Sequence, residues 1–231
     1  MRRVAALVVA AGRGRRFGSL KQFAPLGGKP VLAWSLEAFE SDRSVAEIVL
    51  VLPDKRLGGQ FTAVFRKITA VVKGGPERQD SVAEGFRRID PRAVDLVLVH
   101  DGARPLVSRE LIHRIIEKAE ARGAAIPVIS IEDTLKEIAR GKIVRTLDRT
   151  NLVRVQTPQG FAYELLKKAL FRAERDRFYG TDEAALVERL GIGIFAVAGD
   201  PKNIKITTPH DLKMAEAILD ARLVDNSRGT R

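Results

Sequence analysis

Short apolar runs, rich in Val and Ile, recur along the chain and predict the strands of a sheet. They cover residues 4–9, 48–52, 69–72, 96–99, 125–130 and 194–198. These runs are apolar at nearly every position and lack the period-two alternation of a half-exposed strand. We therefore expect strands that are covered on both faces, as in a parallel sheet.

Amphipathic segments lie between the apolar runs and predict helices, because residues three or four positions apart share one helical face. The apolar stripes are Leu32, Leu36 and Phe39; Val82, Phe86 and Ile89; Leu111, Ile112, Ile115, Ile116 and Ala119; Leu165 and Ala169; and Leu212, Ala215, Ile218 and Leu219. Thr208 and Pro209 suit the N-cap and first position of the last helix. Strands that alternate with helices predict an α/β, Rossmann-like fold, with a mostly parallel twisted sheet wrapped by helices.

Residues 132–151 interrupt this alternation with the charged segment EDTLKEIARGKIVRTLDRTN. A turn centred on Gly141, between two alternating stretches, predicts a projecting β-hairpin arm. Its apolar residues are Leu135, Ile138, Ile143 and Val144. The arm alone could not bury them, so we expect a partner subunit to cover them; the alternative is an exposed, mobile hairpin. We expect residues 223–231 to form a disordered tail.

The chain has 231 residues, 45% of them hydrophobic, which fits one domain over 1–231. Lys and Arg number 40 against 29 Asp and Glu, and the net charge of +11 favours anionic partners. The absence of cysteine excludes disulfides, thiolate catalysis and zinc–cysteine sites. No stretch approaches the roughly 18–20 apolar residues that span a membrane. We expect a soluble, cytoplasmic protein that binds neither membranes nor nucleic acid.

The segment AAGRGRRFGSLKQF, residues 10–23, directly follows the first predicted strand. This places it at the carboxyl edge of the sheet, where open α/β folds bind ligands. Its glycines allow backbone N–H groups to approach phosphate oxygens, and Arg13, Arg15, Arg16 and Lys21 add positive charge. So many cations indicate a triphosphate site. A plain connecting loop and a dinucleotide-binding loop are the alternatives; the latter is disfavoured because PLGGKPVL follows as another turn instead of a helix.

Further motifs follow this loop in a definite order: GGPERQDSV, VHDGARP, DT, LDRTNL, QTPQGF, GTDEAALVE and NIKITTP. Together, over about residues 4–220, the chain resembles the 2-C-methyl-D-erythritol 4-phosphate cytidylyltransferase family. The resemblance implies an enzyme of non-mevalonate isoprenoid biosynthesis. Its reaction would transfer CMP from CTP to 2-C-methyl-D-erythritol 4-phosphate, giving 4-diphosphocytidyl-2-C-methyl-D-erythritol and pyrophosphate.

The acceptor phosphate has a second pKa of about 6 and is already a dianion at neutral pH, so the reaction requires no general base. Positioning, cations and Mg²⁺ should supply the catalysis. The resemblance implies that Arg16, Lys21 and Lys205 contact the reacting phosphates. It assigns nucleotide binding to Ala10, Ala11, Gly12, Gly14, Gly75, Ser81, Asp101 and Gly102. Asp101 is also the candidate metal ligand, with Mg²⁺ held mainly by the CTP phosphates. Solvated surface charges, and an N-cap role for Ser81, are the alternatives.

The resemblance assigns acceptor binding to Arg104, Thr134, Arg149, Thr157 and Thr181. Arginine suits a terminal phosphate because its guanidinium binds two oxygens at once. Arg149 would reach into the neighbouring subunit's site, which makes the expected assembly a homodimer. Thr181 could instead cap a helix. We expect His100 to be structural.

Two other functions compete with this interpretation. Ribitol-5-phosphate cytidylyltransferases share the fold, although HDGARP together with LDRTNL favours the methylerythritol enzyme. A nucleic-acid-binding protein would suit the positive charge, but it requires exposed aromatic residues between the cations. Aromatic residues make up only 6% of this chain.

Overall fold

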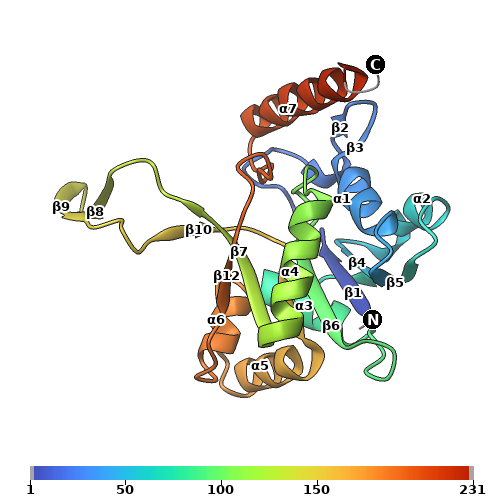
Figure 1. Ribbon diagram of the computed structural model, residues 1–231, viewed down its shortest axis with the longest axis horizontal. Helices are drawn as coiled ribbons and strands as arrows, with labels where there is room; N and C mark the ends of the chain where they lie inside the picture. Colours follow the sequence, from blue (N-terminus) through green and yellow to red (C-terminus); the bar gives the residue numbers. More distant parts are fainter. Residues whose placement is uncertain (1–2, 229–231) are drawn as a thin grey trace.

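The computed structural model describes residues 3–228, with the backbone alone for 223–228, and centres on an eight-stranded sheet (Figure 1). Its strand order is β10-β7-β11-β6-β1-β4-β5, and β12 also pairs with β7. The strands are β1 (Val4–Val9), β4 (Val45–Leu52), β5 (Ile68–Lys73), β6 (Leu96–Asp101), β7 (Ala124–Ser130), β10 (Val153–Val155), β11 (Gln159–Ala162) and β12 (Phe195–Ala198). Every apolar run that predicted a strand forms one.

The sheet is mixed but mostly parallel, as the sequence predicts. Strands β5, β4, β1 and β6 run parallel to one another, and β12 runs parallel to β7. Strand β11 lies antiparallel between β6 and β7, and β10 is antiparallel to β7. We did not predict β10 and β11, because the polar QTPQ segment interrupts their apolar residues. The expected cover on both faces fails at β12, where Phe195 is 38% exposed.

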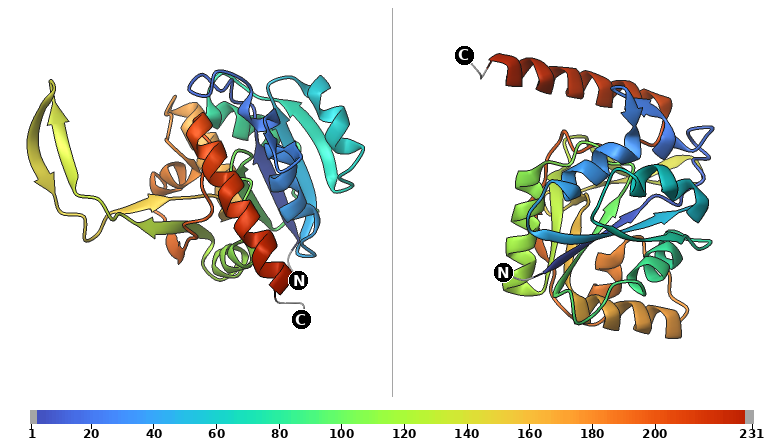
Figure 2. Two further views of the ribbon diagram at one scale, coloured as in Figure 1. Left: turned by 90° about the horizontal axis from the view of Figure 1, so that it is seen from above. Right: turned by 90° about the vertical axis from the view of Figure 1, so that its right-hand side faces the viewer.

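Helices cover both faces of the sheet (Figure 2). They are α1 (Val31–Glu40), α2 (Gly59–Thr62), α3 (Arg78–Phe86), α4 (Arg109–Arg122), α5 (Tyr163–Arg175), α6 (Glu183–Glu188) and α7 (Pro209–Arg228), with short 3₁₀ helices at Lys21–Phe23 and Lys55–Gly58. Each predicted apolar stripe lies on one of these helices or, at Ile89, just beyond it. None of the helices within residues 3–228 combines the length and hydropathy needed to cross a bilayer.

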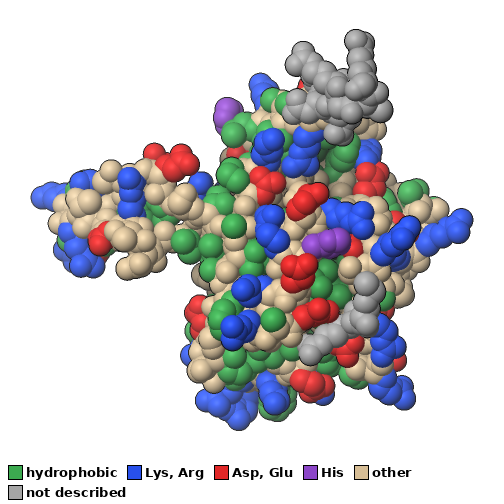
Figure 3. All heavy atoms as spheres, viewed as in Figure 1, with side chains coloured by type: hydrophobic (Ala, Val, Ile, Leu, Met, Phe, Trp, Pro, Cys, Tyr) green, Lys and Arg blue, Asp and Glu red, His purple; other side chains and the backbone are tan. Residues whose placement is uncertain are grey.

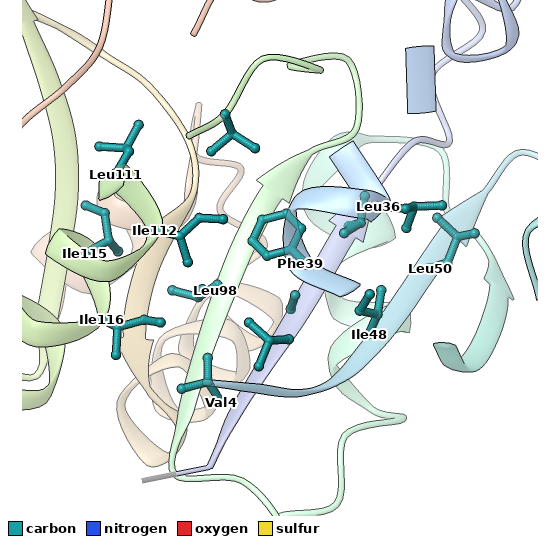
Figure 4. Packing of buried hydrophobic residues seen from close by; sticks show 14 of the residues in the cluster. Val4, Leu36, Phe39, Ile48, Leu50, Leu98, Leu111, Ile112, Ile115 and Ile116 are labelled. Carbon is teal, nitrogen blue, oxygen red and sulfur yellow. The ribbon is translucent and has the colours of Figure 1, made fainter. Parts of the chain in front are cut away.

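The two faces of the sheet form two apolar cores. On one face, Val4 and Leu98 pack with residues of α1 and α4, which are labelled in Figure 4, and with Phe61 of α2. On the other face, Leu7 and Val99 pack with α3, α5 and α6. Full burial of such a side chain contributes about 1.5–3 kcal/mol. The sheet is thus a rigid platform for the loops at the ends of its strands.

Helix α7 lies apart from these layers (Figure 2), and its apolar residues form a third core. Leu219 and Ala215 of α7 pack there with Ile206, with Leu26 of the small hairpin formed by β2 (Pro25–Leu26) and β3 (Lys29–Pro30), and with Phe17.

The predicted start of α7 is confirmed. The hydroxyl of Thr208 accepts a hydrogen bond from the Asp211 amide at 3.4 Å, and Asp211 accepts one from the Thr208 amide at 2.8 Å. The backbone of residues 223–228 continues α7, and the disorder expected over residues 223–231 stays a prediction. The sequence between Pro209 and Gly229 contains no further glycine or proline to end the helix. Residues 229–231 lie outside the described residues.

The predicted arm forms a β-hairpin of β8 (Leu135–Ala139) and β9 (Lys142–Leu147) that projects from the sheet (Figures 1 and 2). Its two-residue turn has positive φ angles of 48° at Arg140 and 78° at Gly141, as tight hairpin turns require. Hydrophobic and basic side chains lie together on its surface (Figure 3). Ile143 is 62% exposed in this chain. The use of the arm in dimerisation stays a prediction.

Phe161 of β11 is fully buried, whereas Phe171 of α5 is 66% exposed. We expect Phe161→Ala to lower the free energy of unfolding by about 3–5 kcal/mol, because it leaves a cavity in the core. Phe171→Ala removes the same atoms from the surface and should change the free energy of unfolding by less than about 0.5 kcal/mol. Denaturant titration measures both variants. Equal losses would contradict the placement of β11 inside the sheet.

Candidate active site

A cavity of about 780 Å³ opens at the carboxyl ends of β1 and β6. The chain leaves β1 for β4 and β5 on one side and returns on the other side as β6. This reversal is a topological switch point, where open α/β sheets bind ligands. Residues 9–16, Lys21 and Gln22 line the cavity after β1, residues 75–78 and Ser81 line it at the start of α3, and Asp101, Ala103, Lys205 and Thr207 complete it.

The glycine-rich loop wraps one side of this cavity. Gly14 has a φ of 65°, and a Cβ atom there would lie 1.8 Å from the backbone oxygen of Ser19, so only glycine fits. The buried side chain of Gln22 donates hydrogen bonds to the backbone oxygens of Ala10, at 2.8 Å, and Gly12, at 3.1 Å. Gln22 was not predicted from the sequence, because a single polar residue in a loop carries no periodic signal.

The predicted catalytic cations Arg16, Lys21 and Lys205 all line the cavity. The Lys205 ammonium lies 2.6 Å from one oxygen of Asp101. Burial, with the neighbouring charge of Lys205, lowers the pKa of Lys21 to about 8. Positive charges held this close repel one another, and a polyphosphate would relieve that repulsion.

Asp101 lies between two cations and is 7% exposed. Its Oδ1 accepts a hydrogen bond from Arg78 Nε at 3.0 Å, and its Oδ2 accepts one from Lys205 Nζ at 2.6 Å. Burial disfavours the charged form, but Arg78 and Lys205 outweigh burial and hold the pKa of Asp101 well below its usual range. Asp101 is therefore an anion at neutral pH.

Asp101 could supply one metal ligand, since each carboxylate oxygen keeps a lone pair beyond its hydrogen bond. Among the described residues, no group of three or more acidic, histidine or cysteine side chains is arranged to hold a metal. Mg²⁺ commonly binds through one or two carboxylates together with substrate phosphates. The site fits an ion of that kind.

Arg78, which the sequence analysis did not identify, joins Asp101 to a second acid. Its Nη1 donates to both carboxylate oxygens of Glu183, at 2.7 and 2.9 Å, and the Glu183 side chain is 1% exposed. Burial opposes its charge, but Glu183 and Asp101 raise the pKa of Arg78 above its ordinary value. Arg78 and Glu183 lie 105 positions apart in the sequence. No local pattern could have paired them.

The predicted nucleotide-binding residues lie together, with one exception. Ala10, Ala11, Gly12, Gly14, Gly75, Ser81 and Asp101 line the cavity. Gly102 does not line it and instead packs closely, since a Cβ atom there would lie 2.8 Å from Leu32. The alternative N-cap role of Ser81 is wrong, because Glu77 caps α3. The Ser81 hydroxyl instead donates to the backbone oxygen of Glu77 at 3.1 Å.

Thr157, a predicted acceptor contact, lies beneath Asp101 in a chain of hydrogen bonds. Burial lowers the pKa of His100 to about 3, so its ring is neutral. The backbone oxygen of Arg104 can only accept, so Nε2 of His100 donates to it, at 3.2 Å. Nδ1 of His100 then accepts from the Thr157 hydroxyl at 3.2 Å, and that hydroxyl accepts from the Asp101 amide at 3.1 Å. His100 is structural, as expected, and Thr157 holds the backbone of Asp101.

None of the predicted acceptor residues, Thr157 included, lines this cavity of its own chain. The Arg104 guanidinium donates to the Asn203 oxygen at 2.8 Å, and Thr134, Arg149 and Thr181 are exposed. Arg149 donates to the backbone oxygen of Glu132 at the base of the arm. The alternative capping role of Thr181 is wrong, because Asp182 caps α6. Their roles in acceptor binding stay predictions.

Comparison with known proteins identifies the family. The family model for 2-C-methyl-D-erythritol 4-phosphate cytidylyltransferase matches residues 4–221. The chain belongs to this family. The enzyme of that name from Geobacillus thermodenitrificans is 43% identical over 228 residues, which cover 95% of this chain and 98% of the relative. This protein is thus a cytidylyltransferase, a nucleotidyltransferase of isoprenoid biosynthesis, as the resemblance implied.

Solved structures confirm the α/β fold. The crystal structure of the Thermus thermophilus enzyme matches with a TM-score of 0.77 and 36% identity, covering 93% of this chain and 98% of that one. A crystal structure of 4-diphosphocytidyl-2C-methyl-D-erythritol synthase matches with a TM-score of 0.82 and 33% identity, covering 95% and 99%.

The pKa of Lys21, about 8, predicts how activity depends on pH. Lys21 is charged below this pKa and neutral above it, so kcat/KM for CTP should fall as the pH rises through about 8. In Lys21→Arg the guanidinium stays charged, and we expect this alkaline limb to disappear. The control is Lys118→Arg, on the exposed side of α4, which should keep the wild-type profile. An unchanged limb in Lys21→Arg would assign the titration to another group.

Proposed function

We propose that the cavity at the carboxyl ends of β1 and β6 is where this cytidylyltransferase transfers CMP from CTP to 2-C-methyl-D-erythritol 4-phosphate. The products would be 4-diphosphocytidyl-2-C-methyl-D-erythritol and pyrophosphate. The observation that supports this site most directly is the convergence of Arg16, Lys21 and Lys205 on one cavity. The negative charge of a triphosphate would balance the positive charge of these three side chains.

In the proposed reaction, an oxygen of the acceptor phosphate attacks the α-phosphorus of CTP. The new P–O bond forms as the bond from that phosphorus to the bridging oxygen breaks, and pyrophosphate leaves with the bonding electrons. The second pKa of the attacking phosphate is about 6, so at neutral pH the group is a dianion and has no proton for a base to remove. The protein's task is to hold two anions together, and Arg16, Lys21 and Lys205 would stabilise the charge on the transferred group.

Mg²⁺ is part of this proposal, with Asp101 as its protein ligand. When bound, the ion would neutralise charge on the triphosphate. The Asp101 carboxylate is suited to this role because it stays ionised between Arg78 and Lys205. Lys205 would then contact both the carboxylate and the phosphates.

The proposed assembly is a homodimer in which the arm completes the partner's site. Thr134 and Arg149 belong to the arm segment and lie outside the cavity of their own chain. The exposed apolar residues of the arm, among them Ile138 and Val144, support burial against a second copy. Arg104, Thr157 and Thr181 remain proposed acceptor contacts, and the cytoplasmic location remains a prediction from the sequence.

Pyrophosphate release, measured with Mg²⁺, tests the reaction and its acceptor. We expect rapid release with CTP and 2-C-methyl-D-erythritol 4-phosphate, and little release with UTP or without acceptor. Backbone groups and the Ser81 hydroxyl in a small pocket would discriminate the base. A preference for ribitol 5-phosphate would keep the chemistry and overturn the acceptor. No release with any pair, from folded protein, would overturn the proposed function.

Mixed dimers test the shared site. Lys21→Ala should inactivate a subunit's own cavity, and Arg149→Ala should inactivate the site of its partner. Mixing the two variants places both defects in one site of each heterodimer and leaves the other site intact. We therefore expect activity well above that of either parent. Heterodimers as inactive as both parents would contradict an arm that acts across the interface.

A further inference from the structure

The first turn of α3 lies between the nucleotide cavity and the loop 178–183, hereafter the acceptor loop because it carries Thr181. Residues 75–78 and Ser81, on one side of this turn, line the cavity. Arg78, Gln79 and Asp80, within the same turn, each bond to the acceptor loop. Three consecutive side chains of α3 thus join this helix to the acceptor loop, which lies about 100 positions further along the chain.

Arg78 is the residue that touches both sides. One edge of its guanidinium bonds to Asp101 in the cavity, with Nε 3.0 Å from Oδ1. Its Nη1 is shared by both oxygens of Glu183, at 2.7 and 2.9 Å, at the end of the acceptor loop. Since the guanidinium is planar and rigid, movement of Glu183 would be transmitted to the carboxylate of Asp101.

Gln79 holds the middle of the acceptor loop. Its side-chain nitrogen donates to the backbone oxygen of Phe178 at 2.9 Å, and its side-chain oxygen accepts from the Gly180 amide at 2.9 Å. Asp80 accepts a further hydrogen bond from the Tyr179 hydroxyl at 3.2 Å. Two hydrogen bonds from one amide side chain to the backbone fix the position of the residues immediately before Thr181.

Stability alone does not account for the Arg78–Glu183 pair. Removing two charges from water is costly, and well-packed apolar residues often stabilise a fold as much as a buried ion pair does. What an ion pair with several bonds adds is a defined geometry. Here the geometry relates the carboxylate in the nucleotide cavity to the loop that carries a proposed acceptor contact.

We infer that Arg78 is a positioning residue that holds the acceptor loop in register with the nucleotide cavity through Glu183. This inference rests on the proposed function of the cavity. Arg78 acts through Asp101 on the nucleotide side and through Glu183 on the acceptor side. Gln79 supports the second link and has no part in the first.

Separate KM values for the two substrates test this inference. Glu183→Gln weakens the link from Arg78 to the loop, and Gln79→Leu breaks the other anchor. Each should raise the KM for 2-C-methyl-D-erythritol 4-phosphate by about tenfold and change the KM for CTP by less than about twofold. Arg78→Met removes both links and should raise both KM values. Adding Glu183→Gln to Arg78→Met should raise the acceptor KM no further, because the link is already absent.

Arg87→Met is the matched control. Arg87 follows the same helix and bonds to Glu84 at 2.7 Å and to Glu174 at 3.1 Å, but it is half exposed and does not line the cavity. Both KM values should match those of the wild type. Thermal denaturation of each variant establishes that it is folded at the assay temperature. If Arg78→Met does not fold, Glu183→Gln and Gln79→Leu still decide the question.

An unchanged acceptor KM in folded Glu183→Gln and Gln79→Leu would overturn the inference. So would an equal rise in both KM values in these two variants, since a general loss of structure would produce it. Failure of the proposed function is distinguishable, because then the wild type and Arg87→Met would also release no pyrophosphate from CTP and the acceptor. That result would overturn the proposed function and this inference with it.

Discussion

The geometry of the cavity depends on the buried carboxylate of Asp101. Its two oxygens bond to Arg78 and Lys205, which come from segments far apart in the chain. Without this anion, the cations of the cavity would face one another in a partly dehydrated space, where their repulsion is only weakly screened. With it, Lys205 is held beside the loop that carries Arg16 and Lys21. Asp101 thus lets the protein gather positive charge before a substrate arrives.

The position of Asp101 is in turn determined by the sheet and by neutral hydrogen bonds beneath it. Strand β6 is buried along its whole length, and Asp101 is its last residue. The Asp101 amide donates to Thr157, whose hydroxyl donates to neutral His100. A protonated His100 would place a positive charge in the core. Because its pKa is about 3, the ring stays neutral and the hydrogen bonds beneath Asp101 stay unchanged at neutral pH. The rigid core and the charged site therefore meet at a single residue.

Much of this arrangement could be predicted from the sequence, because it depends on local patterns. The apolar runs identified the strands that carry the site, and a glycine-rich loop after the first of them placed a phosphate site at the sheet edge. The hairpin turn at Gly141 has a local signature of the same kind. Arg78 and Glu183 could not be paired, because that contact exists only after folding. Strand β11 was missed because its short sequence has no strand pattern. It is a strand only because it pairs with β6 and β7, which come from distant parts of the chain.

The third apolar core gives helix α7 an influence on the site that its sequence position does not suggest. Leu219 and Ala215 of α7 share this core with Phe17, which follows Arg16, and with Ile206, which follows Lys205. The C-terminal helix is thus a common support for two of the cavity's cations, though none of its residues up to Arg222, where the described side chains end, lines the cavity. For protein engineering, this makes the C-terminus a poor place for a truncation or a rigid fusion. A fused domain that tilts α7 would change the distance between Arg16 and Lys205 while the sheet stayed intact.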